Sequence, residues 1–191
     1  MTNRAQRRDE THQRIIEAAG RLFRQHGVDG VGVDAIMREA GLTHGGFYAH
    51  FASKEALAAE VSRYLLGRSA ARWTDCSMQP DPAEALRRIV QPYLSADHVR
   101  APGGCPLATL SSEAGRRATM RHAMDEPLQA MLAALERCLP DPASAPAVLA
   151  TMVGAVTLGR LADDPAFGEQ FLRAAARMVL PEAVSSADTA A

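Results

Sequence analysis

Residues 41–57, GLTHGGFYAHFASKEAL, bring several helix boundaries together in one short stretch. Gly41 suits the left-handed backbone that ends many helices, so a helix is expected to stop just before it. Thr43 can cap the helix that follows directly, and Ser53 can cap a further one. Two helices joined by such a short turn have the pattern of a helix-turn-helix, in which the second helix enters the major groove of DNA.

The residues before this stretch predict two helices. Apolar side chains recur at helical spacing from Thr11 to His26, and Gly27 supplies the stop. A shorter run with the same spacing begins at Val33 and closes at Gly41. The first segment is locally cationic: Arg4, Arg7, Arg8, Arg14, Arg21 and Arg24 stand against Asp9, Glu10 and Glu17. The whole chain is nearly neutral, with 21 Lys and Arg against 22 Asp and Glu.

Helical patterns also fill the rest of the chain, and no alternating strand pattern occurs, so the fold is expected to be all-α. The expected helices run from Lys54 toward Trp73, from Pro82 toward His98, from Pro106 to Glu113, from Ala118 to Leu139, and twice more after Pro142. Pro92 and Pro127 are expected to kink or divide the helices that contain them.

The predicted organisation is a helix-turn-helix domain over residues 1–53, a helical ligand-binding and dimerisation domain over 54–182, and a disordered tail over 183–191. The chain has 191 residues and is 47% apolar, enough for a real core. No run approaches the roughly 18 apolar residues of a membrane span, and the N-terminus lacks the apolar core of a signal peptide. A cytoplasmic protein with no membrane partner is therefore expected.

The sequence offers no pattern for catalysis, a metal or a cofactor. It has no phosphate-binding Walker loop, no nucleophile elbow and no zinc-protease helix. Its three cysteines, Cys76, Cys105 and Cys138, are odd in number and far apart, which suits neither a disulfide framework nor a zinc knuckle, so reduced thiols are expected. An enzyme with a spatially assembled triad and a protein-binding helical module are the alternatives to a DNA-binding protein.

Three features of the central stretch point toward DNA. Gly45 and Gly46 each weaken a helix by about 1 kcal/mol relative to Ala, which fits a helix whose backbone approaches base edges. The alternative is that the helix is merely weak. Lys54 and the free amides after Ser53 form an anion site at a helix start. Tyr48 and His50 are expected to face outward as phosphate donors, although a histidine alone would more often be a surface or core residue.

The stretch from Arg14 to Leu57, including IIEAAGRLFRQHGVDGVGVDAIMREAGLTHGGFYAHFASKEAL, resembles the DNA-binding domain of the tetracycline-repressor (TetR) family. The resemblance implies phosphate contacts at Thr43, Tyr48, His50 and Lys54, and base contacts at His44 and Gly45. Lysine is common in the family where His44 stands, and a small residue other than glycine where Gly46 stands. The first departure implies weaker phosphate affinity, and the second implies a less rigid recognition helix.

A second subunit and an effector are the other expected partners. One recognition helix covers only one half-site, so a homodimer on a palindromic double-stranded operator is expected. The resemblance places a four-helix dimer bundle at the last two helices, where small residues recur: Gly154, Ala155, Gly159, Ala174, Ala175 and Ala176. The alternative is that these small residues pack inside one chain.

The predicted effector site lies on the intervening helices. Trp73, Tyr93, Met120 and Met124, together with Met78 and Met131, could line an adaptable apolar cavity, or they could be plain core. Cys105 follows two glycines and precedes a proline, which places its sulfur at a helix N-terminus, where a thiolate is favoured. The effector could be an electrophile or oxidant that modifies Cys105, or it could be a noncovalent ligand; either would release the protein from DNA. Together these features predict a ligand-responsive repressor.

Overall fold

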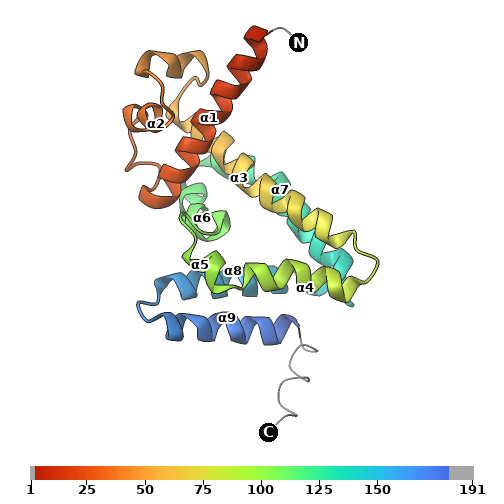
Figure 1. Cartoon of the computed structure of the whole chain (residues 1–191). Helices are drawn as coiled ribbons and strands as arrows, with labels where there is room; N and C mark the ends of the chain where they lie inside the picture. Colours follow the sequence, from red (N-terminus) through yellow and green to blue (C-terminus); the bar gives the residue numbers. More distant parts are fainter. Residues whose placement is uncertain (1–2, 181–191) are drawn as a thin grey trace.

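The computed structural model describes residues 3–180, and over that range it contains helices and no strand, which confirms the all-α prediction (Figure 1). Its α-helices are α1 (Asn3–His26), α2 (Val33–Glu39), α3 (Lys54–Ser77), α4 (Pro82–Tyr93), α5 (Ala96–Arg100), α6 (Pro106–Arg116), α7 (Ala118–Cys138), α8 (Ala145–Leu161) and α9 (Pro165–Val179). Two short 3-10 helices are η1 (His44–Ala49) and η2 (Pro142–Ser144). The predicted tail, 183–191, lies outside the described residues.

The first helices end where their glycines predict. Gly27 and Gly41 adopt φ values of +72° and +68°, and each directly follows the last turn of a helix. The start of α1 was predicted at Thr11, which is wrong, since the helix begins at Asn3. The added turns, residues 3–10, have no apolar stripe that could have predicted them; a local polar contact stabilises them, in which Gln6 donates to the Glu10 carboxylate at 3.3 Å.

The predicted recognition helix is present as η1, a 3-10 helix rather than an α-helix. Thr43 occupies the cap position, but its side chain makes no cap hydrogen bond, so that part of the prediction is wrong. The adjacent glycines disfavour a regular α-helix, and the backbone closes through tighter bonds such as Gly46 N to Thr43 O at 3.1 Å. Phe47 is fully buried and anchors the element.

Helix α3 connects the two parts of the chain (Figure 1). Ser53 caps it as predicted, its side-chain oxygen accepting a hydrogen bond from Ala56 N at 3.0 Å. From there α3 runs beside α7 along most of its length and carries Trp73 near its far end. The buried apolar side chains form one continuous core from Ile15 to Leu180.

The middle helices differ in two places from the sequence-based expectation. The helix from Pro82 was predicted to run toward His98, but it ends at Tyr93, because Ser95 starts a new one. The Ser95 hydroxyl donates to Pro92 O at 2.8 Å and accepts from His98 N at 3.1 Å. Pro127, by contrast, lies inside an uninterrupted α7.

Helices α8 and α9 lie antiparallel at the end of the molecule opposite α2 (Figure 1). Their close approach depends on two glycines, since a Cβ on Gly168 would lie only 2.8 Å from Gly159 O. Within residues 142–161, an 18-residue window has a mean hydropathy of 1.4, which by length and composition alone would suffice for a membrane span, and 22% of that window is buried in the chain.

Candidate nucleic-acid interface and effector core

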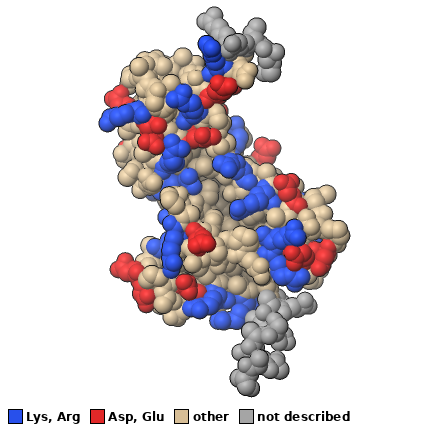
Figure 2. Space-filling model, viewed as in Figure 1, with Lys and Arg blue, Asp and Glu red and all other residues tan. Residues whose placement is uncertain are grey.

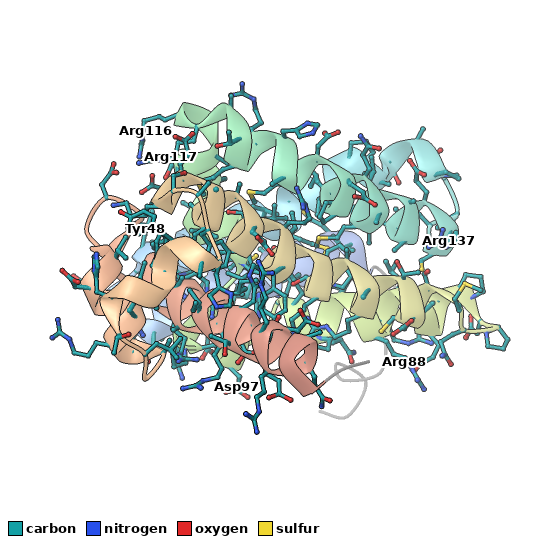
Figure 3. All side chains as sticks on the ribbon, turned by 90° about the horizontal axis from the view of Figure 1, so that it is seen from above. Tyr48, Arg88, Asp97, Arg116, Arg117 and Arg137 are labelled. Atoms are coloured by element: carbon teal, nitrogen blue, oxygen red, sulfur yellow. The ribbon has the colours of Figure 1, made fainter. Side chains whose placement is uncertain are left out.

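The outer face of η1 carries most of the residues predicted to contact DNA. Thr43, His44, Gly45 and Tyr48 are all exposed, and the Tyr48 side chain is 65% exposed (Figure 3). The Tyr48 ring packs edge-on against the buried Phe47 ring, with 5.2 Å between centroids. The buried Phe47 ring therefore supports the Tyr48 ring, and the Tyr48 side chain faces away from the core, as predicted.

The two glycines of η1 are not required by packing within the chain. A Cβ on Gly45 would meet no atom within 4 Å, and one on Gly46 would lie 3.6 Å from the Met37 terminal methyl, an ordinary contact. Neither glycine has a positive φ. The chain itself would accept alanine at both positions.

His44 has a neighbour that sequence reasoning missed. Its Nδ1 makes a short hydrogen bond with the Asp34 carboxylate, from the first turn of α2. The two residues lie ten positions apart in sequence, with a turn between them. The signal in the sequence was that each residue stands in the first turn of a short predicted helix. Asp34 fixes the imidazole orientation and places a negative charge next to a predicted base contact.

His50 is half-buried instead of facing outward. Its Nδ1 is shielded from solvent and has no hydrogen-bond partner. Burial lowers the pKa of His50 below its usual value, and the nearby His12 and Arg8 lower it further. The cause is that the chain turns inward at Phe51, on whose ring His12 stacks at 4.4 Å. His50 thus joins a small cluster between η1 and α1.

Lys54 also points partly inward. Its Nζ donates to the main-chain oxygens of Val28 at 3.1 Å and Val31 at 3.2 Å, in the loop between α1 and α2. Two of the three ammonium hydrogens are used there, so one remains for a phosphate. Of the amides at the start of α3, Ala56 N is already bonded to Ser53.

Arg8 and Arg14 are further candidates that residue patterns did not single out. Arg8 donates to Ala49 O, at the end of η1, at 3.4 Å, and Arg14 donates to Ala40 O, at the end of α2, at 2.6 Å. Both place a guanidinium group at the end of a short helix. The signal in the sequence was the excess of arginine in the first segment.

The predicted effector residues other than Met78 are buried, and Trp73, Tyr93 and Cys105 contact one another in that order. Trp73 and Tyr93 pack edge to face at 5.3 Å, and the Tyr93 hydroxyl lies 2.9 Å from Cys105 Sγ. Burial raises the pKa of Tyr93 far above its usual value, and the Cys105 contact adds to the shift. Met120 and Met124 are buried in the same core. Met78 is 71% exposed, so its predicted place in a cavity lining is wrong.

Two polar atoms of this core have no partner. Trp73 Nε1 is buried without a hydrogen bond, as is Nε2 of His98, whose ring lies 4.9 Å from that of Tyr93. His98 was missed in the sequence because a lone histidine in a predicted helix carries no distinguishing pattern. An unpaired indole N–H is costly, and a ligand that accepts this hydrogen bond would remove the cost.

Cys105 occupies the position before α6, as predicted, but it is only 2% exposed. The preceding Gly103 and Gly104 both adopt positive φ values, +81° and +55°, and are themselves buried. Cys76 and Cys138 are also free thiols. Among the described residues, 3–180, no group of three or more His, Cys, Asp or Glu side chains is placed to hold a metal ion.

The small residues predicted at a dimer interface are divided between two environments. Ala155 and Ala175 are buried, and Gly159 packs against α9, so these three serve the contact between α8 and α9. Ala174 is exposed, and Gly154 has open space at its Cβ position. Large apolar side chains are exposed nearby: Leu158 at 46%, Leu161 at 74%, Phe167 at 50% and Met178 at 75%.

Comparison with known proteins identifies the class. The family model described as "Bacterial regulatory proteins, tetR family" matches residues 15–61, which extend from α1 into α3. Among curated proteins, YxaF of Bacillus subtilis is 31% identical over 56% of this chain and 57% of its own length. AcrR of Shigella flexneri is 34% identical over 44% of this chain and 40% of its own. The chain spans about a fifth of YerO of Bacillus subtilis, which is 39% identical over the matched part.

Solved structures share the fold over nearly the whole chain. The reduced form of Escherichia coli NemR superposes with a TM-score of 0.74 at 21% identity, covering 87% of this chain and 95% of NemR. A regulator from Streptomyces coelicolor gives a TM-score of 0.69 at 24% identity, with 89% and 98% covered.

The fold and the exposed η1 face define a helix-turn-helix protein with an all-helical second part. Over residues 15–61 the chain is similar to the TetR family of bacterial regulatory proteins, and it shares the overall fold of a solved TetR-family regulator. Its relatives are named as regulators and not as enzymes, in agreement with the expectation of no catalysis.

Proposed function

We propose that the protein is a cytoplasmic, homodimeric repressor that binds a palindromic operator through η1 and leaves it when an effector reaches the helical core. The observation that carries the proposal is the outer face of η1, where Tyr48 is 65% exposed and Gly45 is open although nothing in the chain requires glycine there. The test is binding of the purified protein to the DNA flanking its own gene, searched first for an inverted repeat. A shuffled duplex of the same length is the control.

We infer different roles for the residues that are proposed to face DNA. Gly45 and His44 lie on the exposed face of η1 and are suited to approach base edges, while Thr43 and Tyr48 offer hydroxyls to phosphates. Lys54 has one ammonium hydrogen left after bonding the α1–α2 loop, so it contributes to both loop geometry and phosphate binding. His50, being half-buried, supports η1 more than it contacts DNA.

The exposed apolar face of α8 and α9 is proposed to be the dimer interface. Residues 142–161 are apolar and only partly buried, and Leu161 and Phe167 are exposed on the two helices. Such a surface marks an interaction site in a protein that functions in water. Two copies of this pair would form a four-helix bundle that presents two η1 faces to successive half-sites. Sedimentation of the purified protein tests this part directly.

Cys105 is proposed to be the reactive sensor. An activated alkene would form a bond from Cys105 Sγ to its electrophilic carbon, while the carbon–carbon double bond becomes single and the thiol proton is transferred to the neighbouring carbon. Because Cys105 is buried under Tyr93, the reaction requires opening of this core, and the adduct prevents the core from closing. A noncovalent inducer with a hydrogen-bond acceptor is the second candidate, favoured by the unpaired Trp73 Nε1.

Helix α6 provides the connection from Cys105 to the DNA-binding end. Its last turn contacts the α1–α2 loop: Glu113 accepts from Val28 N at 3.3 Å, and Arg117, which follows α6, pairs with both Glu113 and Asp29. Figure 3 shows Arg117 at the same end of the molecule as Tyr48. A displacement of α6 by an adduct on Cys105, the residue before it, would therefore act on the loop that Lys54 also holds.

The sensor proposal is tested by labelling kinetics with an enone reagent. Wild-type protein and Cys76→Ser are expected to lose operator affinity as one thiol reacts, and Cys105→Ser is expected to keep it. Retention of operator binding after stoichiometric modification of Cys105 would exclude the covalent route and leave the noncovalent one.

A further inference from the structure

Two arginines from distant parts of the chain rest against the turn before Cys105. Arg24, on α1, donates to Gly104 O at 3.4 Å, and Arg160, on α8, donates to Val99 O at 2.6 Å. A Cβ on Gly103 would lie 2.8 Å from Arg24 Cζ, and one on Gly104 would overlap the Arg160 guanidinium group. Because neither glycine has a side chain, both guanidinium groups can lie directly on the backbone of the turn.

Helix α3 carries two more guanidinium groups near this turn: the charge of Arg68 acts on Arg24, and that of Arg72 acts on His98. Arg68 and Arg72 are one helical turn apart and both exposed. Among residues 3–180, none of the four arginines (Arg24, Arg68, Arg72 and Arg160) has a carboxylate within ion-pair distance. Figure 2 shows Lys and Arg side chains, with acidic ones among them, on the face that carries α1 and α3 in Figure 1.

The cluster is electrostatically uncompensated. Burial lowers the pKa of Arg24 below its usual value, and the charges of Arg21, Arg68 and Arg160 lower it further. Of these neighbours, Arg21 alone has an acidic partner, Glu39 at 3.1 Å. The remaining positive charges repel one another, and a bound anion would turn that repulsion into attraction.

His98 adds a polar atom to the same place. Its Nε2 is buried and has no hydrogen-bond partner. Burial lowers the pKa of His98, and the charges of Arg72 and Arg160 lower it further, which keeps the ring neutral. A neutral imidazole that carries its proton on Nε2 is a hydrogen-bond donor, and an oxyanion among the arginines would give it an acceptor.

We propose that Arg24, Arg68, Arg72 and Arg160 bind a compact oxyanion, a phosphate or carboxylate group carried by a small metabolite. Guanidinium forks match the paired oxygens of both groups. Two of the forks are held in place by main-chain oxygens, so little ordering is needed on binding. The bound anion would join α1, α3 and α8. If the proposed function holds, it would also adjust operator affinity by fixing α1 against the sensor turn.

The test is titration calorimetry of the full-length protein without DNA, with inorganic phosphate in one arm and citrate in the other, at constant ionic strength. Arg68→Gln and Arg72→Gln are the main variants, because both side chains are exposed and neither is hydrogen-bonded to the main chain. Each is expected to raise the dissociation constant about fivefold to tenfold in at least one arm. Arg63→Gln, on a different face of α3, is the matched control and is expected to bind like the wild type.

Two results would overturn the proposal. One is absence of saturable binding of either anion to the wild type, and the other is an equal loss in Arg63→Gln, which would indicate general attraction by a basic surface. A change in the salt dependence of operator binding in Arg68→Gln or Arg72→Gln without any change in anion binding would assign the cluster to DNA instead. Anion binding is measured without operator, so its failure is distinct from failure of the repressor function.

Discussion

Gly45→Ala should change stability and operator binding in opposite directions. No atom of the chain lies within 4 Å of the added Cβ and the backbone φ is negative, so the methyl group causes no strain. Alanine restricts the unfolded chain, and the free energy of unfolding should rise by about 0.5 kcal/mol. If the backbone at Gly45 approaches base edges, the same methyl group should weaken operator binding by about 1 to 3 kcal/mol, or about fivefold to 150-fold.

The matched control is Gly67→Ala, in the middle of α3. Its added Cβ also meets nothing within 4 Å, so it should be stabilising by a similar or larger amount. It lies away from η1 and should leave operator affinity unchanged. Denaturant unfolding gives the stability change, and fluorescence anisotropy with a labelled operator gives the affinity. Operator binding by Gly45→Ala at wild-type strength, together with normal unfolding, would show that Gly45 does not approach the bases.

Three further outcomes are expected. Lys54→Met should lower the free energy of unfolding by about 1 to 3 kcal/mol, because it leaves two main-chain oxygens without their donor. It should also reduce the salt slope of operator binding by about one. A change in that slope with an unaltered free energy of unfolding would contradict the contact between Lys54 and the loop. Because the pKa of His98 is lowered in the folded state, the free energy of unfolding should fall as the pH drops from about 6.5 toward that lower value. His98→Gln should lose this part of the pH dependence, and substitution of the exposed His122, His122→Gln, should keep it. Phe167→Glu should give monomers in analytical ultracentrifugation, and a persistent dimer would place the interface elsewhere.

The parts of the fold that depend on local chemistry could be predicted from the sequence. Gly27 and Gly41 end their helices because the left-handed conformation strains a residue with a side chain. Ser53 caps α3 because a hydroxyl at that position can reach a free amide within one turn. In each case the interacting atoms lie within a few residues, so the one-dimensional pattern contains the physical cause.

The parts that depend on tertiary contacts could not be predicted in this way. The direction of Lys54 is set by loop oxygens more than twenty residues earlier, and the inward turn of His50 by a ring on α1. Cys105 was located correctly at a helix start, but its contact with Tyr93 depends on where the fold places the end of α4 relative to the residue before α6. Burial of a predicted site is likewise a property of the whole core.

The unbroken course of α3 has a mechanical consequence. Trp73 and Lys54 lie on the same rod, roughly 28 Å apart at the rise of an α-helix. Pivoting this rod by about 5° at its Trp73 end would swing the other end sideways by about 2.5 Å, comparable to the length of a hydrogen bond. A bound effector near Trp73 would thus need to tilt α3 only slightly to move Lys54 and the adjoining η1 out of register with the major groove of DNA.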